Sequence, residues 1–153
     1  MPHGHVLAMH LRRAYLTMHR RFQNHFDGFG VTADQFVLLT LLAEVEGVAQ
    51  KDLVARSFSD PNTLRAMLVL LENKGLVLRR PHETDGRARL VFLTPKGRKL
   101  QQELWRSAAP LHQLLLDGVP AGGVEALQQQ LARVAEVMAQ TKTRRRPTAG
   151  RQS

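Results

Sequence analysis

The spacing of the apolar residues changes at Gly75 and changes back after residue 93, and this interruption limits the folds available to the chain. Before Gly75, apolar residues recur every three to four positions, as in amphipathic helices. After it, segments 77–80 and 89–93 are short and apolar, and an Asp-Gly pair lies between them, which predicts a two-stranded ribbon. Helical spacing then returns. We therefore expect a mainly α (α+β) protein.

Local end signals define the helices that precede the ribbon. A first amphipathic helix is expected over residues 6–29, where glycines favour the left-handed backbone that ends helices. A second helix begins after Thr32, with Gln35 as its capping-box partner. A short third helix is expected over 49–56.

The fourth helix has the clearest start. Asp60 can accept hydrogen bonds from the first free backbone N–H groups, and Pro61 occupies the first helical position, where a missing N–H costs nothing. This helix is expected to end at Asn73, before Gly75. The order of elements so far is three helices and a well-capped fourth, followed by the ribbon.

Two further helices are expected after the ribbon. Thr94 caps one that continues to about residue 115, where the glycines of segment 118–123 break it. The last spans 124–140, and its apolar residues alternate three and four positions apart, a spacing that usually docks on another helix.

The chain carries a net charge of +9 with neutral histidines. Segment 79–99 contains seven basic and two acidic residues, and a second basic cluster lies in segment 142–151. Such an excess attracts polyanions and releases counterions when it meets phosphates. The tail cluster suits a solvated, disordered segment. That interpretation explains the first cluster less well, because its charges lie in the ribbon.

Several classes of protein are excluded. There is no cysteine, and hence no disulfide or thiolate metal site. No acid–base pair, nucleophile motif or phosphate-binding loop indicates an enzyme. The N-terminal His3, His5 and His10 lack a partner at ligand spacing, so we expect neither a metal site nor a cofactor. No apolar run reaches the roughly 18 residues that span a bilayer, and segment 1–13 is unlike a signal peptide, so we expect a cytoplasmic protein without a membrane partner.

Residues 31–93 have the element order of a winged helix-turn-helix. Such a motif presents the N-terminal part of its second helix to the major groove of double-stranded DNA. Asparagine and arginine can read adenine and guanine there, and threonine or alanine can meet the thymine methyl group. The corresponding exposed positions are Asn62, Thr63, Arg65 and Ala66. The ribbon turn carries Arg87 and Arg89 and is short enough to enter a minor groove, whose negative potential attracts arginine.

The chain resembles the multiple-antibiotic-resistance regulator (MarR) family over roughly residues 7–138. The resemblance rests on the stretches VTADQFVLLTLLAE, AQKDLVAR, DPNTLRAMLVLLENKGLVLRR and DGRARLVFLTPKG. The last two weigh most, because Leu-Glu-x-x-Gly-Leu-Val followed by Asp-x-Arg and Leu-Thr-x-x-Gly is distinctive. The resemblance implies a DNA-binding lobe at 31–94, a helical dimerisation region at 1–30 and 95–141, and a disordered basic tail at 142–153.

By the same resemblance, the protein would be a homodimeric, ligand-responsive repressor that binds a pseudo-palindromic operator. Arg87 would reach the minor groove, and Asp85 would hold the base of the wing in place. Small anionic or phenolic effectors bind members of this family between the dimerisation helices and the DNA-binding lobe. The implied pocket residues here are Arg12, Tyr15, His19 and Phe36.

The second helix of the motif departs from the family pattern. Val69 and Leu70 stand where many relatives have a polar or basic pair, Arg65 where Thr or Ser is common, and Ala66 where Arg is common. Base reading is therefore expected to be unusual, or to depend more on the wing and on phosphate contacts. An alternative is a winged-helix dimer that acts as a scaffold or ligand-binding protein with weak or non-specific DNA binding.

Overall fold

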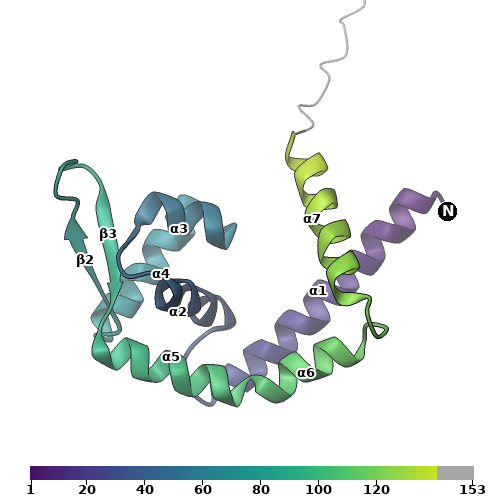
Figure 1. Ribbon diagram of the computed structural model, residues 1–153, viewed down its shortest axis with the longest axis horizontal. Helices are drawn as coiled ribbons and strands as arrows, with labels where there is room; N and C mark the ends of the chain where they lie inside the picture. Colours follow the sequence, from purple (N-terminus) through teal and green to yellow (C-terminus); the bar gives the residue numbers. More distant parts are fainter. Residues whose placement is uncertain (141–153) are drawn as a thin grey trace, which may run out of the picture. The chain divides into compact units, whose positions relative to one another are not determined.

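The computed structural model describes residues 1–140, so the basic tail expected at 142–153 lies outside the described residues. The described part of the chain is mainly helical and contains one small sheet (Figure 1). Its elements in chain order are α1 (His3–Asp27), α2 (Ala33–Glu44), β1 (Val48–Ala49), α3 (Gln50–Ser57), α4 (Pro61–Asn73), β2 (Val77–Pro81), β3 (Arg89–Leu93), α5 (Pro95–Ser107), α6 (Ala109–Asp117) and α7 (Val124–Gln140). These bounds confirm the expected order of four helices followed by the ribbon, and they differ from it at β1 and at the division between α5 and α6.

The predicted capping signals are confirmed at the start of α2. The backbone N–H of Gln35 donates to Thr32 Oγ1 at 3.0 Å, and the backbone N–H of Thr32 donates to Gln35 Oε1 at 3.1 Å. The amide oxygen of Gln23 also accepts from the backbone N–H of Ala33 at 3.0 Å. Three backbone donors that a helix start leaves free are thus satisfied by side chains.

The sheet has three antiparallel strands in the order β1-β3-β2, whereas the sequence indicated two. The additional strand β1 pairs Val48 with Val91 and Ala49 with Leu90. Its two residues are fixed by pairing with a distant strand, which no local pattern reveals. Because Ala49 belongs to this strand, α3 begins at Gln50, one residue later than expected.

The helix expected from Thr94 to about residue 115 is interrupted, so this prediction was wrong. α5 ends at Ser107, and α6 begins at Ala109. Pro110 has no N–H to donate to the carbonyl four residues earlier, and its ring disfavours helical backbone in the residue before it. Hydrogen bonding resumes when the N–H of His112 donates to the Ala108 carbonyl at 3.0 Å.

The core lies among α2, α3, α4, α5 and one face of the sheet. Its fully buried side chains are mostly leucines, joined by Phe26 of α1 and by Val91 of the central strand. α4 contributes Leu64, Leu68 and Leu71, each with none of its surface exposed. Because these three positions share one side of a helix, burying them turns the opposite side of α4 to solvent. The core therefore determines which face of α4 is available for binding.

Contacts divide the chain into two compact units, of which the first is Met1–His112 and the second begins at Gln113. Within the second, α7 buries none of its residues. Its apolar seam is 37–75% exposed over Leu127, Leu131, Val134 and Met138. No helix in the described residues is both long and apolar enough to cross a membrane.

Candidate nucleic-acid interface

The predicted base-reading residues lie together on the solvent side of α4. Asn62, Thr63, Arg65 and Ala66 are all exposed in its first two turns. The Asp60 carboxylate accepts from the backbone N–H of Asn62 at 3.0 Å and of Thr63 at 3.1 Å, and also from the Thr63 hydroxyl. This N-cap fixes the start of α4, so the early side chains project from a defined helix end.

The same bonds alter the acidity of the cap. The Thr63 hydroxyl and then the two backbone N–H groups stabilise the charged form of Asp60, and they hold the pKa of this carboxyl below its ordinary value. Asp60 is therefore ionised at neutral pH. The Thr63 hydroxyl is engaged with Asp60, so it can meet a base only if that bond is exchanged or through its methyl group.

The ribbon of β2, β3 and the turn between them is the wing of the predicted motif. Its turn is ordered by its own hydrogen bonds. The Nδ1 of His82 accepts from the backbone N–H of Thr84 at 3.2 Å and of Asp85 at 3.3 Å. Asp85 Oδ1 accepts from the backbone N–H of Arg87 at 3.1 Å, and the Asp85 carbonyl accepts from the N–H of Ala88 at 3.1 Å. These contacts of Asp85 lie within the turn itself. They leave the Arg87 side chain exposed, with no salt bridge to any residue described.

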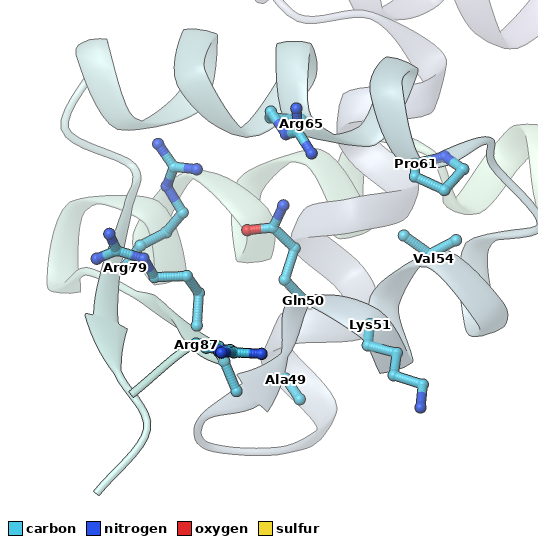
Figure 2. Close-up of a pocket in the computed structure, with 10 residues that line it drawn as sticks. Ala49, Gln50, Lys51, Val54, Pro61, Arg65, Arg79 and Arg87 are labelled. Atoms are coloured by element: carbon cyan, nitrogen blue, oxygen red, sulfur yellow. The ribbon is translucent and has the colours of Figure 1, made fainter. Parts of the chain in front are cut away.

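An open groove of about 510 Å³ separates α4 from the wing, and its lining joins the two predicted DNA-contacting parts. Arg65 of α4 and Arg87 and Arg89 of the wing all line it. Figure 2 shows Gln50 extending between Arg65 and Arg79, from the start of α3. Five of the lining side chains are cationic and none is a carboxylate: Lys51, Arg65, Arg79, Arg87 and Arg89.

Three polar residues of this groove were not predicted from the sequence: Gln50, Lys51 and Arg79. Arg79 pairs with Val91 in the strand register and shares the side of β2 on which Val77 is buried. Because side chains alternate between the two faces of a strand, the sequence could have predicted that Arg79 lies on the same face as Val77. Gln50 and Lys51 reach the groove because α3 packs against α4, and local sequence carries no signal for that.

Arg79 also links the wing to α4. Its Nε and Nη2 donate to the Glu72 carboxylate at 3.1 and 3.3 Å. The hydrogen bonds and charge of Arg79 lower the pKa of Glu72 despite some desolvation, so Glu72 is ionised at neutral pH. Glu72 thereby offsets one of the cationic charges of the groove.

The four predicted effector residues lie partly together. Tyr15 and His19 stack on consecutive turns of α1, with ring centroids 5.6 Å apart. Arg12 is exposed one turn earlier. Phe36 is buried instead, with its ring 4.5 Å from Phe26.

Comparisons with known proteins identify the class of protein. The model of the MarR family matches residues 31–88, which include α2, β1, α3, α4, β2 and the following turn and end before β3. Transcriptional regulator HosA of Escherichia coli O157:H7 is 31% identical over 93 residues, which cover 58% of this chain and 69% of HosA.

Two solved structures with bound DNA are also similar. The transcriptional repressor CouR, bound to a 23-mer DNA duplex, is 28% identical with a TM-score of 0.77, covering 86% of this chain and 94% of CouR. A mutant MarR from E. coli, complexed with operator DNA, is 26% identical with a TM-score of 0.77, covering 84% of this chain and 92% of that protein. The chain therefore belongs to the MarR family of DNA-binding transcriptional regulators, which are not enzymes.

Proposed function

We propose that this protein is a ligand-responsive repressor that binds a pseudo-palindromic operator as a homodimer. The cationic groove between α4 and the wing is the observation that carries the proposal. A groove lined by five cations and no carboxylate favours a polyanion, and each neutralised phosphate releases counterions. In this proposal, α4 enters the major groove through Asn62, Arg65 and Ala66, and Arg87 with Arg89 reaches the adjoining minor groove.

The exposed apolar residues of the last helices support a homodimer. Leu114, Leu115 and Leu116 of α6 are 44–50% exposed, and the seam of α7 is exposed as well. Exposed apolar residues that recur along one side of a helix, as they do on α7, mark protein–protein interfaces. A second copy is the partner that a two-fold operator requires, because half-sites about one turn (roughly 10 bp) apart mirror the symmetry of a dimer.

The ligand response is proposed for the face of α1 that carries Arg12, Tyr15 and His19. A guanidinium one turn from a stacked phenol and imidazole suits a small anionic or phenolic effector. A titration with 4-hydroxybenzoate, a phenolic acid, is expected to release wild-type protein from its operator. Arg12→Ala should keep operator binding and lose the release. Equal release of the two proteins would contradict this assignment.

Operator binding is tested by fluorescence anisotropy with the intergenic duplex beside the gene, in competition with random duplex. We expect preference for the intergenic duplex. Arg87→Ala should weaken binding and make the log–log salt slope shallower by about 0.9 for each phosphate that the variant no longer neutralises.

Arg21→Ala is the matched control, because it removes the same charge from an exposed position of α1 outside the groove. It should leave affinity and slope nearly unchanged. Sedimentation should give twice the chain mass of 17.2 kDa for all three proteins. Equal affinity for the two duplexes would refute specific regulation and favour the scaffold alternative that Val69 and Leu70 leave open.

A further inference from the structure

The exposed face of α4 carries an apolar band in its second half. Val69 is 40% exposed and Leu70 is 52% exposed, and Ala66 is exposed one turn earlier. None of the three belongs to the core that α4 builds with its opposite side. Neighbouring apolar side chains that are exposed on a surface mark sites where a partner binds, so this band indicates a contact made outside the described fold.

Helical geometry places this band in line with the predicted base-reading residues. At 100° per residue, positions 62, 66, 69 and 73 fall within about 60° of one another. The resulting row is Asn62, Ala66, Val69 and Asn73, all exposed, with Leu70 beside it. Whatever surface meets Asn62 along the helix axis therefore also meets Ala66 and Val69.

The surroundings of the band favour DNA as that surface. Arg65 projects from the same exposed side of α4 into the cationic groove, which contains no carboxylate. Within the major groove, the apolar feature that base edges present is the C5-methyl group of thymine. Ala66 and Leu70 are separated by about 6 Å along the axis at 1.5 Å per residue, which spans about two base steps of 3.4 Å.

We propose that Ala66, Val69 and Leu70 read the C5-methyl groups of thymines at two neighbouring base pairs in each half-site. In this proposal, the apolar residues that stand here in place of the family's polar ones change the kind of contact made with the bases, and base reading is retained. This inference rests on the proposed operator binding. It adds that the operator carries thymines opposite the second half of α4, flanked by the bases that Asn62 and Arg65 contact.

The test begins with selection of bound duplexes from a random library. Thymines at enriched positions are then replaced one at a time by deoxyuridine, which removes the methyl group and keeps the base pair. A methyl group buried against an apolar side chain contributes about 0.8 kcal/mol, so affinity should fall about fourfold per methyl and about fifteenfold when both half-sites are changed.

Variants of the protein connect the methyl group to its reader. Val69→Ala and Leu70→Ala should bind the selected duplex more weakly and should discriminate less between thymine and deoxyuridine, a coupling that a double-mutant cycle measures. Val37→Ala is the matched control, because Val37 is 43% exposed on α2, outside the groove. It should keep the full discrimination. All three substitutions are at exposed positions, and equal thermal melts would confirm that folding is intact.

Ionic strength separates this contact from the charged ones. The effect of deoxyuridine should be the same at about 50 and about 200 mM salt, whereas the effect of Arg87→Ala should shrink as salt rises, since phosphate contacts act through counterion release. Enrichment of an operator whose thymines can all be replaced by deoxyuridine at unchanged affinity would overturn the inference and leave operator binding standing. Failure to enrich any sequence would instead remove the proposed function.

Discussion

Gly97, the third residue of α5, lies directly against the turn that joins α4 to the wing. A Cβ atom added there would be 2.0 Å from the carbonyl oxygen of Leu76, 2.9 Å from its carbonyl carbon and 3.2 Å from its Cα. The neighbour is backbone, and that backbone is held in place because the Leu76 N–H donates to the Leu71 carbonyl at 3.0 Å. In Gly97→Ala, the start of α5 must therefore move away.

The size of this movement determines the expected cost. Reaching ordinary contact at 3.4 Å requires a shift of about 1.4 Å. This shift strains two hydrogen bonds of the Thr94 cap, from its N–H to the Leu76 carbonyl at 3.1 Å and from its hydroxyl to the Gly75 carbonyl at 2.6 Å. Each is worth about 0.5–1.5 kcal/mol, and overpacking adds about 1–3 kcal/mol. Alanine returns about 0.5–1 kcal/mol of helix propensity. We expect a net destabilisation of about 2–4 kcal/mol.

Urea unfolding followed by far-ultraviolet circular dichroism measures this destabilisation, at one fixed protein concentration because the stability of the proposed dimer would depend on concentration. Gly4→Ala is the matched control: it is also helical, and an added Cβ meets nothing within 4 Å. It should be neutral or slightly stabilising. If Gly97→Ala unfolds at the same urea concentration as Gly4→Ala, the close approach of α5 to Leu76 is not what restricts this position.

Three further perturbations follow from the geometry. Asp60→Ser should keep the cap but lose its acid dependence. The lowered pKa of Asp60 contributes stability above its unfolded pKa of about 3.9, and that stability is lost as pH falls through the folded pKa, which acid unfolding curves would detect. Glu72→Gln should free Arg79 to bind a phosphate and steepen the salt slope of binding to random duplex by up to about 0.9. An unchanged slope would show that Arg79 does not reach a phosphate even without the Glu72 carboxylate. Gly47→Ala should cost more than Gly30→Ala in thermal melts. Both have positive φ (74° and 71°), but only at the former does a Cβ meet a ring, at 2.8 Å. Equal destabilisation would show that backbone strain alone matters.

Elements with local end signals could be predicted from the sequence. Thr32 with Gln35, and Asp60 with Pro61, define helix starts through atoms at most three residues apart, and both starts were predicted correctly. β1 was missed because its two residues are fixed by pairing with Val91, far along the chain. The break before Pro110 did have a local signal, the missing N–H of proline, which the regular leucine spacing outweighed in the prediction.

The candidate interface divides in a similar way. The exposure of Asn62, Arg65 and Ala66 follows from the helical period, because the buried leucines of α4 define the opposite face. The cationic groove does not follow from any single element, because Lys51 reaches it from α3 and Arg79 from β2. Its charge results from tertiary packing. The sequence alone could therefore indicate which segments are basic, but it could not show that their side chains line one groove.

The ion pair between Arg79 and Glu72 has a consequence for the operator. It joins the last turn of α4 to the first strand of the wing, and the Thr94 hydroxyl ties the start of α5 to the turn between them. Within one protomer, these contacts hold α4 and the wing together, so the proposed complex would have a constant spacing between the bases under α4 and the minor groove under the wing. In the proposed complex, we expect an extra base pair inside a half-site to weaken binding with or without effector. A change in the number of base pairs between half-sites alters how strongly the effector acts.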